Sequence, residues 1–249
     1  MREILGMRRR LRFGRKKGPA LLDAALHCAT EWHWPVLPGV GLETAETTRT
    51  TRTTRTAWTA WTTKTGKVVG GSGGPVRACA CPDPDCVVPG AHPFDPGLLA
   101  ATADPRMVRW WWTNRPDAPV LLATGGRAPC AVSLPGTAAA RALTVLDRRG
   151  LRIGPVVATP TRWSLLVAPY SLERLGELLY AKDCVPSSLR FHGEGGYLVL
   201  PPSQTGAGGV RWERPPAPGG LWLPDVEAVV DALVEASTGA PDGGSRLRY

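Results

Sequence analysis

The sequence contains no apolar run long enough to cross a lipid bilayer, which takes about 20 consecutive residues. We therefore expect no membrane-spanning segment and no integral membrane protein. The N-terminus is basic but lacks the apolar stretch and the small-residue cleavage site of a signal peptide. A G-x-x-x-x-G-K-[ST] phosphate loop is also absent, so the sequence does not indicate a P-loop nucleotide hydrolase.

Cysteine is scarce, with six residues in a chain of 249. Three of them, Cys28, Cys130 and Cys184, stand singly within apolar stretches and are predicted to be buried thiols. Single buried thiols, together with the lack of a signal-peptide pattern, indicate a reducing cytoplasm. The length allows one large domain or two small ones.

Positive charge is concentrated in two segments of the chain. Residues 1–17 carry eight basic side chains and one acidic one, and residues 43–67 carry five against two, so the rest of the chain is close to neutral. We expect residues 1–17 to form a flexible basic arm and residues 238–249 a flexible tail. The arm could hold a phosphate backbone without reading sequence, or it could act only as a solubilising segment.

Residues 43–75 form a Thr-, Arg- and Gly-rich stretch of low complexity, and we expect a disordered insertion there. Trp58 and Trp61 lie among basic residues and could stack on single-stranded bases. Repeat expansion of a surface loop is the simpler interpretation, and it is the one we favour.

The segment most indicative of chemistry has the spacing C-x-C-x4-C-x5-H and contains Cys79, Cys81, Cys86 and His92. Prolines hold it in turns and exclude a helix or a central strand. Three thiols and an imidazole form the ligand set of a closed structural zinc site, so we expect Zn²⁺ here. Free or disulfide-bonded cysteines are the alternative.

The apolar pattern between residues 18 and 237 alternates between strands and helices without the regular repeat of a doubly wound sheet. This favours an α+β domain with a mixed or antiparallel sheet flanked by helices. We expect helices to begin near Pro19, Pro105, Thr137 and Ser171, and a final helix to lie within residues 223–237. Strands are expected over residues 34–38, 120–123, 131–134, 155–159, 164–168 and 197–200.

Several short motifs occur in an order that resembles the primase–polymerase (prim-pol) domain of the archaeo-eukaryotic primase superfamily. They are the opening helix followed by Trp34-Pro35-Val36-Leu37-Pro38, the Cys79–Pro93 loop, Trp110-Trp111, Thr124-Gly125, and Gly195-Gly196-Tyr197 leading to Pro201-Pro202-Ser203. Each motif is short, but the ordered set covers roughly residues 18–215. The resemblance implies a prim-pol-like domain over residues 18–237.

Active members of that family carry two acidic residues on the strand after Thr-Gly, and these hold divalent metals that bridge the nucleotide phosphates. Here that strand reads Cys130-Ala131-Val132-Ser133-Leu134-Pro135, without a carboxylate. The family's second motif contains a histidine, which the stretch Thr159–Leu166 lacks. The third acid is replaced by the stretch Ser188–His192. The resemblance therefore implies a scaffold without its catalytic positions.

Three functions are compatible with these observations. We favour a catalytically inactive prim-pol domain with no catalytic residue, which retains a role in DNA or nucleotide binding or in regulation. Arg190 and His192 are the candidate phosphate-facing residues, although a plain surface strand pair would also explain them. An active primase or polymerase would need Mg²⁺ or Mn²⁺ held by other acids, for which Asp147, Asp183 and Glu194 are the candidates. A structural module unrelated to DNA is the third possibility.

Overall fold

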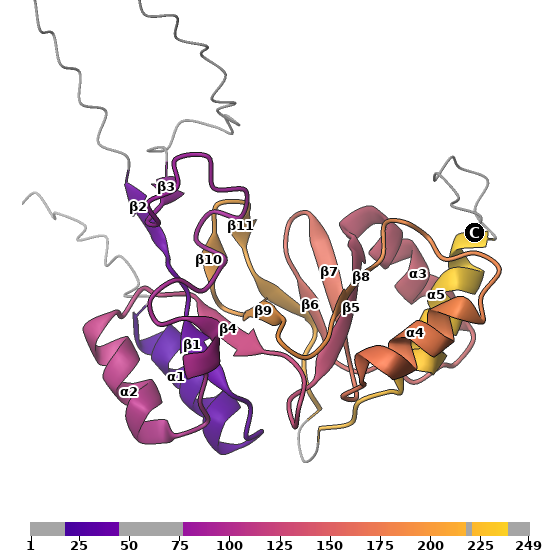
Figure 1. Ribbon diagram of the computed structural model, residues 1–249, viewed down its shortest axis with the longest axis horizontal. Coiled ribbons are helices and arrows are strands. Elements are labelled where there is room, and N and C mark those ends of the chain that lie inside the picture. The colour runs from indigo at the N-terminus through magenta and orange to yellow at the C-terminus, as the bar shows by residue number, and fades with distance from the viewer. Residues whose placement is uncertain (1–17, 45–76, 218–220, 239–249) are drawn as a thin grey trace, which may run out of the picture.

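The computed structural model describes residues 18–44, 77–217 and 221–238. The predicted basic arm, residues 45–75 of the predicted insertion with Trp58 and Trp61, and residues 239–249 of the predicted tail lie outside the described residues. Figure 1 shows the arrangement of the elements, with a smaller group around α1 and α2 and a larger group around α3, α4 and α5.

Helices α1 (Gly18–Thr30) and α2 (Pro105–Asn114) form the smaller group. Helix α2 begins where the Asp104 carboxylate accepts a hydrogen bond from the Arg106 N–H, with proline in the first turn. Its three consecutive tryptophans divide as expected from helical geometry, since Trp111 and Trp112 are buried while Trp110 is 61% exposed. The two helices pack on each other and on a three-stranded antiparallel sheet in the order β1-β4-β9. Its strands are β1 (Val36–Pro38), β4 (Val120–Ala123) and β9 (Tyr197–Leu200).

The larger group is built on a five-stranded antiparallel sheet in the order β12-β6-β7-β5-β8. Its strands are β5 (Cys130–Pro135), β6 (Val156–Ala158), β7 (Arg162–Val167), β8 (Arg190–His192) and β12 (Arg211–Arg214). Helices α3 (Gly136–Arg148), α4 (Leu172–Tyr180) and α5 (Val226–Thr238) lie together on one side of this sheet (Figure 1).

The alternation along β5 separates two hydrophobic cores. Cys130, Val132 and Leu134 face the helices α3 and α5 and belong to the second core, whereas Ala131 belongs to the first core with α1, α2 and the three-stranded sheet. Because successive side chains of a strand point to opposite faces, Ser133 lies on the same face as Ala131. This polar residue is 2% exposed, so it is a buried hydroxyl on the face turned away from the helices.

Two short hairpins and one 3-10 turn complete the fold. Strand β2 (Leu42–Thr44) pairs with β3 (Arg77–Cys79), and β10 (Gln204–Thr205) pairs with β11 (Gly208–Gly209). The turn η1 spans Leu98–Ala100. Among the described residues, no helix has the length and apolar content needed to span a bilayer.

The predicted α+β class is confirmed, and the sheets are antiparallel throughout the described pairings. The predicted helices and the six predicted strands are present, with ends shifted by a few residues. Cys28 and Cys130 are buried as predicted, but the prediction for Cys184 is wrong. Cys184 lies in the loop after α4 and is half-buried, because the apolar residues around it pack only partly against the second core.

Candidate metal centre and the polar face of strand β5

Cys79, Cys81, Cys86 and His92 converge, as the sequence predicts. One ligand atom from each of these residues lies within 4.8 Å of all the others, and no other group of three or more such residues is found in the described part of the chain. Cys79 Sγ and Cys86 Sγ are each 3.4 Å from His92 Nε2. Four ligands around one zinc ion at Zn–S distances of about 2.3 Å would be separated by about 3.8 Å. The group therefore has nearly the dimensions of a tetrahedral site.

Backbone contacts position this loop between two hairpins. Cys79 ends β3 and pairs with Leu42, and the Ala80 N–H donates to Gly41 O. On the other side, the Gly206 N–H of the β10–β11 turn donates to Pro89 O at 2.8 Å. Gly90 has a φ of +73°, and a Cβ there would lie 2.8 Å from the Leu42 side chain. Glycine is therefore required at position 90, in the turn between Cys86 and His92.

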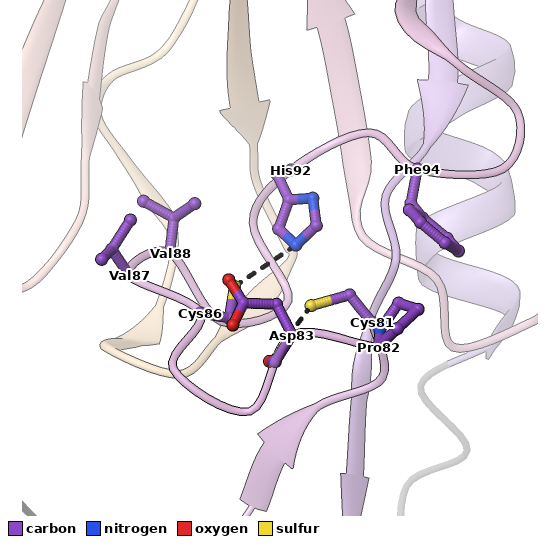
Figure 2. A pocket seen from close by; sticks show the side chains of 8 residues that line it. All are labelled: Cys81, Pro82, Asp83, Cys86, Val87, Val88, His92 and Phe94. Carbon is purple, nitrogen blue, oxygen red and sulfur yellow. Dashed lines mark hydrogen bonds between the residues drawn. The ribbon is translucent and has the colours of Figure 1, made fainter. Parts of the chain in front are cut away.

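The orientation of His92 suits metal binding. Its Nδ1 lies 2.9 Å from Pro93 O, which can only accept a hydrogen bond. Nδ1 must therefore carry the proton and donate, which leaves the lone pair on Nε2 directed at the cysteines. Figure 2 shows His92 pointing toward Cys86 and Cys81 from the far side of the loop.

The thiols differ strongly in acidity. Burial alone would raise the pKa of Cys79, but hydrogen bonds from the N–H groups of Gly90 and Cys81 and interactions with the side chains of Cys81 and His92 outweigh it and lower the pKa to about 7. Burial and then the interactions with Cys79 and Cys81 raise the pKa of Cys86 to about 11. Ionisation of one thiol thus opposes ionisation of the next, and a divalent cation between them would remove that repulsion.

A pocket opens beside this group. It is lined by Cys81, Pro82, Asp83, Cys86, Val87, Val88, His92 and Phe94 (Figure 2). Val87 is 92% exposed, so the outer edge of the loop presents apolar surface to solvent.

A second polar group lies on the face of β5 that is turned away from the helices. Ser133 is paired with Arg190 on one side, and His192 is paired with Ala131. Residues directly opposite each other in antiparallel strands share a face, so these side chains lie together. The Ser133 Oγ and His192 Nε2 atoms are 3.0 Å apart. The structure therefore brings His192 into contact with β5, while Arg190 on the same edge strand β8 is exposed.

Arg162 completes this second group, although the sequence did not single it out. Its Nη2 donates to Ser133 O at 2.8 Å and to Ser188 O at 2.7 Å, and its Nε lies 3.5 Å from Ser133 Oγ. The guanidinium thus lies across β5 at Ser133. We use the name β5 cluster for Ser133, Arg162, Arg190 and His192. In the sequence, the one indication of a role for Arg162 was a charged residue at the start of the otherwise apolar strand β7.

The β5 cluster is electropositive. Burial, followed by the nearby guanidinium groups of Arg162 and Arg190, lowers the pKa of His192 below its ordinary value. Burial, followed by the charge of Arg190, lowers the pKa of Arg162. His192 is therefore neutral at pH 7, and the positive charge comes from the two arginines.

Within the described residues, none of the three candidate acids brings a carboxylate to β5. Asp147 lies on α3 and pairs with Arg214. Asp183 and Glu194 are exposed loop residues. Octahedral Mg²⁺ is bound through carboxylate oxygens, and strand β5 offers none. The residues of the β5 cluster therefore do not fit a catalytic magnesium ion.

Two of the short sequence motifs contact each other next to the β5 cluster. The Thr124 hydroxyl donates to Gly193 O at 2.6 Å. Gly125 has a φ of +93°, and a Cβ there would lie 2.4 Å from Glu194 Cα. The Thr-Gly turn after β4 and the Gly-rich turn before β9 thus pack closely, which fixes the turn that joins β8 to β9.

Comparison with known proteins identifies one family. The family described as "Bifunctional DNA primase/polymerase, N-terminal" matches residues 25–225 of the chain. No curated protein and no solved structure matches the chain in the same comparisons.

Proposed function

The chain belongs to the bifunctional DNA primase/polymerase N-terminal family, and from this premise we propose that it is a catalytically inactive member that binds nucleic acid or nucleotide. The observation that carries the proposal is the composition of β5, which has a buried serine under an arginine where two carboxylates would be needed for metal-dependent nucleotidyl transfer. Arg190 and His192 are the proposed contacts, and the basic segment 1–17 would add sequence-independent affinity for a phosphate backbone.

The alternatives lack support from specific contacts. An active enzyme would need two or more acids to meet at one point, but Asp147 is committed to Arg214, and Asp183 and Glu194 are exposed in separate loops. A module unrelated to DNA would not need an electropositive group on the inner face of a sheet. A reducing compartment such as the cytoplasm suits the free thiols.

The test combines catalysis with binding. Incorporation of labelled nucleotides on primed and unprimed templates, with Mg²⁺ and with Mn²⁺, is expected to show no product. Mobility shift with single-stranded, double-stranded and primed DNA is expected to show binding, which weakens but persists when residues 1–17 are removed. Incorporation that is lost on mutating Asp147, Asp183 or Glu194 would contradict inactivity. Loss of all DNA and nucleotide binding without the arm would remove the proposed role of the domain.

We also propose that the group of Cys79, Cys81, Cys86 and His92 binds a structural Zn²⁺ ion. The support is the convergence of four suitable ligand atoms within 4.8 Å and the lone pair of His92 Nε2 directed at the thiols. The ligand set leaves no open position for a substrate, so the ion would stabilise the loop. Metal analysis of protein purified without added zinc is expected to give one zinc per chain.

A further inference from the structure

The positive charge of the β5 cluster is not neutralised by a carboxylate in the described part of the chain. Arg174, Lys182, Arg211 and Arg214 all pair with carboxylates. Within the described ranges, no carboxylate lies within ion-pair distance of Arg162 or Arg190. Two uncompensated guanidinium groups close enough to lower the pKa of Arg162 repel each other. An anion between them would remove this repulsion.

Arg162 is held in one position before any ligand arrives. Its Nη2 is committed to two backbone carbonyls, Ser133 O and Ser188 O, and its Nε lies over the Ser133 hydroxyl. A guanidinium has five N–H donors, and in the described part of the chain the two on Nη1 make no hydrogen bond. The Arg162 side chain is therefore fixed through Nη2 and Nε, while its Nη1 donors stay available to an anion. Because the side chain is already fixed, less entropy is lost when an anion binds.

The end of the strand adds positive potential. Helix α3 begins at Gly136, directly after β5, and no side chain caps its N-terminus. The partial positive charge of a helix N-terminus favours phosphate groups. This feature would not make a site by itself, but it lies beside Pro135, whose partner in β7 is Arg162.

From these observations we propose that the β5 cluster binds a nucleotide phosphate directly, without a divalent cation, with Arg162 as the anchoring charge. This inference rests on the proposed nucleotide- or nucleic-acid-binding function and specifies its chemistry. A divalent cation would be repelled by the two guanidinium groups and would find no carboxylate on β5. A phosphate with two or more negative charges accepts hydrogen bonds from the free Nη1 of Arg162 and from Arg190.

Binding of dATP in buffer freed of Mg²⁺ by dialysis tests the inference, because a chelator would also strip the cysteine–histidine loop. We expect wild-type protein to bind dATP equally well, within about threefold, with and without Mg²⁺. Arg162→Gln is expected to weaken binding by about tenfold or more, equivalent to about 1.4 kcal/mol. Arg174→Gln removes the same charge from α4, which covers the opposite face, and is expected to leave binding unchanged.

A second variant keeps the test valid if Arg162→Gln is poorly folded, since Arg162 also ties β5 to the Ser188 loop. Arg190 is exposed, so Arg190→Gln should fold normally and weaken dATP binding by about threefold or more. A single-stranded oligonucleotide with a 5′-phosphate is compared with the same oligonucleotide bearing a 5′-hydroxyl. Preference for the phosphorylated end without dATP binding would identify a DNA end as the source of the phosphate.

The outcomes separate the two proposals. Binding that requires Mg²⁺, or that is unchanged in both Arg162→Gln and Arg190→Gln, overturns the inference and leaves the proposed function intact. Absence of dATP and DNA binding under all conditions overturns the proposed function and the inference together.

Discussion

The cysteine–histidine loop and the β5 cluster lie on one scaffold but differ in their relation to metals. The loop brings together three soft thiols and one imidazole with dimensions suited to zinc. The β5 cluster holds two arginines, a neutral histidine and a serine, a set that repels cations. Under our two proposals, the loop would hold a metal that supports the fold, whereas β5 offers no carboxylate ligand for a metal that would support the reaction.

We expect the largest change in stability when a metal ligand of the cysteine–histidine loop is removed. Cys79→Ser removes a ligand and leaves three donors, and we expect loss of bound zinc and destabilisation of about 4 kcal/mol, since loss of a metal is among the costliest single changes. Zinc content and chemical denaturation measure the two effects.

Cys184→Ser serves as the matched control, because Cys184 is half-buried and lies outside the ligand group. It should keep the zinc and cost less than about 1 kcal/mol. Wild-type protein that carries no zinc and is as stable as Cys79→Ser would show that the loop is held by its hydrogen bonds alone.

The second prediction concerns whether a carboxylate can convert the β5 cluster into a metal site. Ser133→Asp would place a carboxylate within reach of Arg162, and we expect an internal ion pair in place of metal binding. Binding of dATP should weaken about tenfold or more, with no gain in affinity for Mg²⁺ or Mn²⁺; calorimetry measures both.

Ala140→Asp adds the same charge on an exposed position of α3, on the opposite side of the sheet, and should bind dATP as the wild type does. Thermal unfolding shows whether Ser133→Asp still folds. A folded Ser133→Asp protein that binds Mn²⁺ tightly would contradict our view that Arg162 excludes cations from this face.

The two regions also differ in how far they could be predicted from the sequence. The loop ligands lie within fourteen residues of each other, and prolines restrict the chain between them, so spacing alone predicted their convergence. The β5 cluster spans β5, β7 and β8, and its contacts depend on strand register. Register was not readable because β8 is short and polar, and Ser133 meets Arg162 across 29 positions of sequence.

The fold shows the same dependence on local signals. Apolar runs such as 120–123 and the helix start at Asp104 were predicted because each signal lies within a few residues. The strands β8 and β12 were missed because their residues are exposed or half-buried, without a fully buried apolar position, and are stabilised by neighbours distant in sequence.

The smallest expected effect concerns the pH dependence of stability. Burial, then Arg162 and Arg190, lowers the pKa of His192 in the folded state below the value of about 6.5 in an unfolded chain. Between these two values the unfolded state binds more protons, so stability decreases as pH falls from about 6.5 through the folded pKa.

His192→Gln, which keeps a polar group near Ser133, should show a shallower decrease in urea-unfolding free energy between pH 7 and pH 5. His33→Gln, outside the β5 cluster, should keep the wild-type slope. Equal slopes in wild type and His192→Gln would mean that neither burial nor the arginines lowers the pKa of this histidine, and would weaken the assignment of an electropositive β5 face.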